Sequence, residues 1–198
     1  MSSEMFSELR NAIAKIVDVP ENEWVFLTKY LKSITLRKKE HMIQEGSVCR
    51  QIGFVTQGVL RSYLLNDGDE IVNEFFFETS FVSSYSSFLT QTVSSINIQA
   101  IEPTTLNLIP FELLQALYSR HNCWLHLGKF MFEQQFIKKC RRETSFLRDS
   151  AALRYFAMLK LYPDIEQRLP QYYIASYLGI APETLSRIRS SKQHAYQS

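Results

Sequence analysis

The chain has 198 residues, 45% of them hydrophobic and 21% charged, which is enough for one large domain or two small ones around a sizeable core. No stretch approaches the roughly 18 apolar residues of a membrane span, and the N-terminus lacks the continuous apolar core of a signal peptide. The cysteines Cys49, Cys123 and Cys140 are odd in number and form no CxxC pair, so neither structural zinc nor a disulfide framework is indicated. We expect a cytoplasmic protein with no metal, no cofactor and no membrane contact.

Charge is distributed unevenly along the chain. The net charge is +2, but from Lys138 onward there are eleven Lys/Arg and five Asp/Glu, whereas residues 1–137 hold eleven and fifteen. An acidic first part and a basic second part indicate that the second part contacts a polyanion. Because runs of charge are usually solvated faces, this pattern needs a motif to support it.

The first half of the chain changes from helical to β-type patterning. Residues 4–16 and 22–33 are predicted to be short helices, because apolar residues recur near helical spacing. From Ser33 to Ile109, short β-type runs are separated by turn signals such as Gln57-Gly58. The predicted strands cover residues 52–56, 60–65, 71–77, 96–101 and 105–109. Short strands at roughly ten-residue spacing indicate an antiparallel β-roll.

Helices are expected again after Pro110. They cover 111–120, 122 to about 147, and 150–161. The long helix has apolar residues around most of its first half, namely Trp124, Leu125, Leu127, Phe130, Met131, Phe132, Phe136 and Ile137. A helix that is apolar on more than one face needs more than one surface to cover it. We expect the roll to cover one face and a second copy of the chain to cover another; a core helix in a monomer is the alternative.

The stretch 171–190, QYYIASYLGIAPETLSRIRS, has the spacing of a helix-turn-helix. With Gln171 as position one, Ala175 falls at position five, Gly179 at nine and Leu185 at fifteen. Two helices that cross near a right angle need a small residue where they touch and a glycine where the chain turns. The motif therefore predicts a helix-turn-helix that reads DNA, with an ordinary helical hairpin as the alternative.

The candidate DNA-binding residues lie at the start of the first helix and along the second. They are Gln171, Tyr172, Ala181, Glu183, Thr184, Ser186, Arg187 and Arg189. Their polar side chains suit contacts with phosphates or base edges. Glu183 and Arg187 are four residues apart, one helical turn, and should project from the same face.

A strand-rich roll, a long helix and a C-terminal helix-turn-helix together resemble the CRP/FNR family of transcription regulators over nearly the whole chain. The markers are glycines at the turns of the roll, Phe88, and the run Glu183-Thr184-Leu185-Ser186-Arg187. The resemblance implies an α+β fold of three parts. These are a jelly-roll-type antiparallel β-roll that serves as sensory domain (1–121), a dimerisation helix (122–149) and a helix-turn-helix domain with a trimmed wing (150–198).

The same resemblance implies roles and partners. In this family the Glu and the following Arg of the recognition helix touch bases, so Glu183 would accept from cytosine N4 and Arg187 would bind a guanine edge. The family's Arg before that Glu is Pro182 here, so one base contact is missing. The implied partners are a palindromic duplex DNA site, a second copy of the chain, RNA polymerase and an unidentified small-molecule effector, in a bacterial cytoplasm.

Cyclic-nucleotide-binding members of the family hold the ligand in a short cassette. Aligned through Phe88 and Ala100, the cassette glycine falls on Ser83, the ribose-binding Glu on Ser84 and the phosphate-binding Arg on Ser94. Burying a cyclic phosphodiester without a cation costs several kcal/mol, so cyclic AMP is not the expected effector. The effector pocket is predicted to involve Arg61, Ser83, Ser84, Tyr85, Ser86, Ser94 and Ser95.

Two other classes of function are alternatives to a DNA-binding regulator. A ligand-binding or protein-interaction module whose helical tail does not read DNA would show no salt-dependent DNA binding. A cupin-like enzyme would need His/Glu metal ligands on the roll, and residues 50–109 contain no histidine. We therefore expect no catalytic residues and no enzymatic activity.

Overall fold

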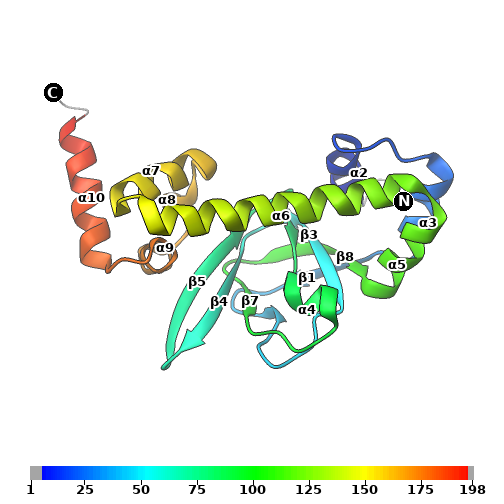
Figure 1. Cartoon of the computed structure of the whole chain (residues 1–198), viewed down its shortest axis with the longest axis horizontal. Helices are drawn as coiled ribbons and strands as arrows, with labels where there is room; N and C mark the ends of the chain where they lie inside the picture. Colours follow the sequence, from blue (N-terminus) through cyan, green and yellow to red (C-terminus); the bar gives the residue numbers. More distant parts are fainter. Residues whose placement is uncertain (1–5, 196–198) are drawn as a thin grey trace. The chain divides into compact units, whose positions relative to one another are not determined.

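A computed structural model describes residues 6–195, with side chains described through Ser190. The chain divides into two compact units. The first comprises the chain up to Leu64 together with Phe75–Gln135, and the second comprises Leu65–Glu74 together with the chain from Phe136 onward. The chain therefore passes between the units in both strands of one β-hairpin and once more within the long helix α6 (Figure 1).

The strands form two four-stranded sheets, with the orders β1-β8-β3-β6 and β2-β7-β4-β5. Their bounds are β1 Lys32–Leu36, β2 His41–Ile43, β3 Gln51–Gln57, β4 Leu60–Asn66, β5 Asp69–Phe76, β6 Phe81–Val82, β7 Asn97–Ala100 and β8 Thr104–Pro110. The central pairs β1–β8, β3–β8 and β4–β7 are antiparallel. The predicted antiparallel roll is confirmed.

Alternating apolar residues fill the interior of the roll. Leu106 and Leu108 on β8 belong to one buried cluster with Leu60 of β4 and Ile98 of β7, while Asn107 between the two leucines points to the other face of its sheet. Side chains of successive strand residues alternate between faces, so the polar residues between these apolar ones are directed out of the interior. This alternation explains why the sequence pattern folds as a roll.

Helices cover the other face of the β3–β8 pair. They are α2 (Ser7–Ala14), α3 (Glu21–Thr28), α5 (Phe111–Arg120) and the first part of α6 (Asn122–Arg148). The residues that pack together here include Leu9, Ile13, Trp24, Leu27, Ile52, Phe54, Ile109, Leu117, Trp124 and Leu127, all nearly or fully buried. This second core is why one face of α6 is apolar.

The first two helices differ in their bounds from the ranges that the sequence predicts. The helix predicted over 22–33 is wrong at its end, because α3 ends at Thr28 and strand β1 begins at Lys32. Pairing of Lys32–Leu36 with Thr104–Leu108 of β8 outweighs the local helical pattern there. The first helix is observed at Ser7–Ala14, and residues 4 and 5 of its predicted range lie outside the described residues.

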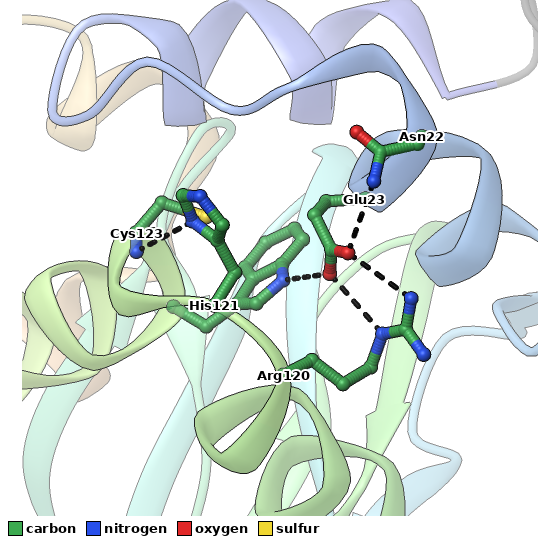
Figure 2. Close-up of polar contacts among 6 residues, drawn as sticks. Asn22, Glu23, Arg120, His121 and Cys123 are labelled. Atoms are coloured by element: carbon green, nitrogen blue, oxygen red, sulfur yellow. Dashed lines mark hydrogen bonds and ion pairs between the residues drawn. The ribbon is translucent and has the colours of Figure 1, made fainter.

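A buried carboxylate joins α3 to the start of α6 (Figure 2). Glu23 is only 4% exposed. It accepts hydrogen bonds from Arg120 Nε at 3.2 Å, Arg120 Nη2 at 3.0 Å and Trp124 Nε1 at 3.0 Å. The neighbouring His121 accepts at Nδ1 from the backbone N–H of Cys123 at 3.2 Å, which satisfies one of the free donors in the first turn of α6.

Helices make up most of the second unit. After the second half of α6 come α7 (Ala151–Leu161), α8 (Ile165–Arg168), α9 (Gln171–Leu178) and α10 (Pro182–Ala195). Their shared core consists of Tyr155, Met158, Ile165, Leu169, Ile174, Ala175, Leu178 and Leu185. No strand follows α7 within the described residues. None of the described helices is both long and apolar enough to cross a membrane.

Candidate nucleic-acid interface

The turn between α9 and α10 depends on Gly179. Its φ of +66° lies in the left-handed region, and its N–H donates to Ala175 and Ser176 carbonyls of the preceding turn. A Cβ at this position would lie 2.7 Å from Cε1 of Phe146. Both the backbone conformation and the lack of space therefore favour glycine where the motif requires it.

Buried residues fix how α10 packs against α9. Ile174, Ala175, Leu178 and Leu185 are each 1% exposed, so Leu185 marks the inner side of α10 and Ala175 is the small residue at the crossing. Because the side chains of Leu185 and Ala175 are buried within this unit, the opposite side of α10 must face outward.

The outward side of α10 carries the residues that the motif predicts for base contacts. Glu183, Ser186 and Arg187 are exposed, and so is Ser190 one turn further on, whereas Thr184 is half-buried. These positions follow the i, i+3, i+4, i+7 spacing of one helix face. Among the described residues, the side chains of Glu183 and Arg187 have no hydrogen-bond or ion-pair partner.

The other predicted DNA-binding residues are distributed around this face. Gln171 and Tyr172 lie exposed at the start of α9, where the rings of Tyr172 and Tyr173 are 4.1 Å apart. Ala181 is exposed in the turn before α10. Arg189 is different, because it is half-buried and its Nε lies 2.7 Å from Oε1 of Glu166.

The tip of the β4–β5 hairpin is attached to α9. Ser176 donates from Oγ to the Glu70 carbonyl at 3.0 Å and accepts from the Val72 N–H at 2.9 Å. Arg142 of α6 donates to the Tyr177 carbonyl at 2.9 Å and lies over the Tyr177 ring. The first helix of the motif is thereby bound to two other segments of its own unit.

Part of the positive charge of the second unit is neutralised internally. Glu74, 4% exposed, lies 2.8 Å from Nζ of Lys138 and 2.9 Å from Nζ of Lys139. Burial by itself raises the pKa of Glu74, but the two ammonium groups outweigh this and lower the pKa below its usual value. The carboxylate is therefore charged and offsets one of the two positive charges of these lysines.

Hydroxyl groups occupy the cassette of the roll. Ser84 and Ser94, the positions aligned with the family's Glu and Arg, are 3% and 2% exposed, and their Oγ atoms are 2.8 Å apart. Ser94 also donates to the Ile96 carbonyl at 2.7 Å. Ser83 donates to the Gln51 carbonyl at 3.2 Å. These hydroxyls satisfy one another and the backbone without any charged group.

The other residues predicted for the effector pocket do not form one site with the Ser84–Ser94 pair. Ser86 and Ser95 are exposed. Tyr85 donates to the Phe81 carbonyl at 3.1 Å. Arg61 is 1% exposed on β4, donates to Oε1 of Gln99 at 2.7 Å and lies over the ring of Tyr63.

The apolar residues of α6 separate into an inner and an outer set. Phe132 packs inward, where its ring meets Tyr85 edge-on at 6.0 Å. The outer set is exposed and consists of Leu125, Phe130, Phe136, Ile137, Cys140, Phe146 and Leu147. Phe130 and Ile137 are one heptad apart, and so are Cys140 and Leu147. Cys140 follows Ile137 by three residues. This is the a/d spacing of a two-helix seam, and we call these four residues the α6 seam.

Comparisons with known proteins agree with this fold. Residues 33–121 match the family model of the cyclic nucleotide-binding domain. FixK2 from Bradyrhizobium japonicum matches with a TM-score of 0.67 and 20% identity over 83% of this chain and 85% of that one. A protein described as a transcriptional regulator of the CRP/FNR family from Eubacterium rectale matches with a TM-score of 0.69 and 20% identity. The match covers 90% of this chain and 85% of that one.

A third solved structure is the c-di-GMP responsive global regulator CLP from Xanthomonas campestris, with a TM-score of 0.68 and 15% identity over 89% of this chain and 93% of that one. No curated protein sequence matches the chain. The predicted fold class and the resemblance to the CRP/FNR family are confirmed. At these identities the likeness to the solved structures concerns the fold.

Proposed function

Because the chain has the fold of the CRP/FNR transcription regulators, we propose that it is a homodimeric, DNA-binding transcription regulator and not an enzyme. We expect it to act in the cytoplasm, where bacterial genomic DNA lies. The observation that carries the proposal is the outward face of α10, on which Glu183 and Arg187 are exposed one turn apart and without partners among the described residues. An α-helix with such a face fits the major groove of B-DNA.

The chemistry of the two side chains suits different bases. A guanidinium donates two parallel hydrogen bonds to O6 and N7 of guanine, and a carboxylate accepts from N4 of cytosine. The proposal therefore assigns Arg187 to a guanine and Glu183 to a cytosine. Gln171 and Tyr172 at the start of α9, with Thr184 and Ser186 on α10, are assigned to phosphates or flanking bases.

The α6 seam supports the homodimer. Two helices that present a/d residues at heptad spacing bury them against each other by knobs-into-holes packing. Phe130, Ile137 and Leu147 are 40%, 39% and 84% exposed, and a second copy of α6 is the proposed cover. A dimer with a two-fold axis would present two copies of α10 to successive major grooves about 34 Å apart.

The cassette supports an effector other than cyclic AMP. The hydrogen-bonded pair Ser84–Ser94 provides neither the carboxylate for a ribose nor the guanidinium for a phosphodiester. The match to CLP, a c-di-GMP responsive protein, supports the view that this fold accepts different effectors. RNA polymerase is the partner expected of a regulator bound near a promoter.

The proposal is tested by binding to duplex DNA. A site is selected from a random duplex pool, and affinities for this site and for unrelated duplex are measured over a range of salt. Arg187→Ala should cost roughly 1–3 kcal/mol on the selected site and relax the preference for one guanine. Arg37→Ala, which removes another exposed arginine, from the roll, serves as the control and should leave that preference unchanged.

The main competing function is a protein-interaction module whose helical tail does not read DNA. Wild-type protein without salt-sensitive DNA binding would support that module and contradict a regulator. An unchanged ratio of specific to non-specific affinity in Arg187→Ala would instead show that a different face reads the bases.

A further inference from the structure

We propose that Glu166 is a positioning residue for base reading, because it holds Arg189 on the inner side of α10 and so presents Arg187 outward. This inference rests on the proposed function. It concerns a side chain outside the helix-turn-helix motif, on the short helix that precedes it. Three described residues carry it, namely Tyr155, Glu166 and Arg189.

Glu166 is itself fixed by the core of its unit. It lies on α8 next to Ile165, which is 0% exposed, and three residues before Leu169, which is 4% exposed. Its Oε1 accepts a hydrogen bond at 2.8 Å from the hydroxyl of Tyr155, a residue of α7 that is 1% exposed. Burial, followed by the bond to Glu166, raises the pKa of Tyr155 to about 12, so the hydroxyl remains a donor at neutral pH.

The fixed carboxylate then binds α10. Nε of Arg189 lies 2.7 Å from the same Oε1 atom. Arg189 follows the buried Leu185 by four residues, so both belong to the inner stripe of α10. Since successive residues are about 100° apart on a helix, Arg187 is about 200° from Arg189. Holding Arg189 inward therefore turns Arg187 toward the outside.

The ion pair with Glu166 also makes Arg189 less available to bind DNA phosphates without sequence preference. A free arginine near the recognition helix binds phosphate of any sequence and steepens the salt dependence. A paired arginine contributes less to such binding. Glu166 should therefore raise specificity in two ways, by orienting Arg187 and by restraining Arg189.

The test uses Glu166→Gln in the full chain. Glutamine keeps an oxygen that can accept from Tyr155 but loses the charge that holds Arg189. Affinity for unrelated duplex should rise. The slope of log affinity against log salt concentration should become steeper by about one. The ratio of selected-site to unrelated-duplex affinity should fall roughly threefold to fivefold, the size expected for a partly exposed ion pair.

Two further variants separate positioning from other effects. Asp164→Asn removes an exposed negative charge two residues away and should leave the affinity ratio unchanged. Arg189→Gln should lower the ratio without raising affinity for unrelated duplex, because no freed cation remains. This second variant also keeps the inference testable if Glu166→Gln does not fold, which thermal denaturation would reveal.

The outcomes distinguish this inference from the proposed function. If the wild type binds its selected site and Glu166→Gln weakens both affinities equally, or behaves as Asp164→Asn does, Glu166 has no positioning role. If the wild type binds no DNA in a salt-sensitive manner, the proposed function itself is contradicted.

Discussion

At the scale of single residues, several carboxylates of this chain are paired with basic side chains. Among them are Glu23 with Arg120, Glu74 with Lys138 and Lys139, and Glu166 with Arg189. The last two sets involve basic residues from Lys138 onward, so part of the positive charge in the second part of the chain is paired with carboxylates of its own unit. Arg187 has no side-chain partner among the described residues and is the arginine that we propose reads a base.

Glu23 provides a prediction about stability. Its hydrogen bonds from Arg120, and next from Trp124, lower its pKa. A carboxylate with a lower pKa in the folded state stabilises the fold above its unfolded pKa of about 4.3, and this stability is lost as pH falls through the folded pKa. Glu23→Gln should lower the free energy of unfolding by roughly 2 kcal/mol at neutral pH and flatten its decline below about pH 5.

Urea denaturation over a range of pH measures this effect. Glu21→Gln is the matched control, because Glu21 pairs with Arg10 at the surface and should contribute little. Parallel pH profiles for the wild type and Glu23→Gln would show that the buried pair does not contribute in this way.

The two cassette serines provide a second residue-scale prediction. Isothermal titration of the wild type with cyclic AMP should show no binding in the micromolar range. The two serines occupy the positions where cyclic-nucleotide-binding members have a charged Glu and Arg. Ser94→Arg alone should not restore binding, since the ribose contact would still be absent. Micromolar affinity in the wild type would contradict this account of the cassette.

At the scale of elements, the sequence predicts those features that local spacing determines. The helix Phe111–Arg120 has the predicted bounds, because Pro110 marks its start and its apolar spacing lies within the segment. The turn at Gly179 follows equally from local spacing. The helical pattern extends over the first two residues of strand β1, because the residues that pair with β1, Thr104–Leu108, lie about seventy residues away and leave no local signal.

In the candidate site, too, local spacing predicts some features, whereas others depend on contacts between distant segments. Spacing alone predicts that Glu183 and Arg187 share one face, and the structure places both on the exposed face of α10. No local pattern links Arg189 to Glu166, because the contact depends on how α8 packs before the motif. For the same reason, the sequence could not show that Phe132 packs inward while Phe130 remains exposed.

The α6 seam provides the element-scale prediction. Ile137→Asp should convert the dimer to monomer in sedimentation at tens of micromolar, because an unpaired carboxylate in the seam is strongly disfavoured. Val25→Asp changes an apolar residue of similar exposure on α3 and should leave the dimer intact. A wild-type protein that sediments as a monomer would contradict the proposed dimer.

Cys140 offers a second readout of the same seam. A residue at a d position of a parallel helix pair faces its own counterpart, so a thiol oxidant such as diamide should join two chains through Cys140. Cys140→Ser should abolish this cross-link, since Cys49 and Cys123 are buried. A cross-link that persists in Cys140→Ser would show that the chains meet elsewhere.

At the scale of the whole molecule, two compact units are joined through the β4–β5 hairpin and through α6. The proposed function requires a pair of such chains, because a single α10 spans only one half-site. Two copies related by a two-fold axis require half-sites whose centres are separated by about one turn of DNA. Both claims, base reading by α10 and dimerisation through α6, therefore predict one geometric property of the DNA site.

The most direct test compares the selected palindrome with the same palindrome carrying five extra base pairs between its half-sites. The insertion rotates one half-site to the opposite face of the duplex while every base contact within each half-site is preserved. The account predicts that affinity falls by at least about tenfold, toward the value for a single half-site, and that Ile137→Asp loses this dependence on spacing. Equal wild-type affinity for the two duplexes, or no salt-sensitive binding to either, would contradict a dimeric DNA-reading regulator.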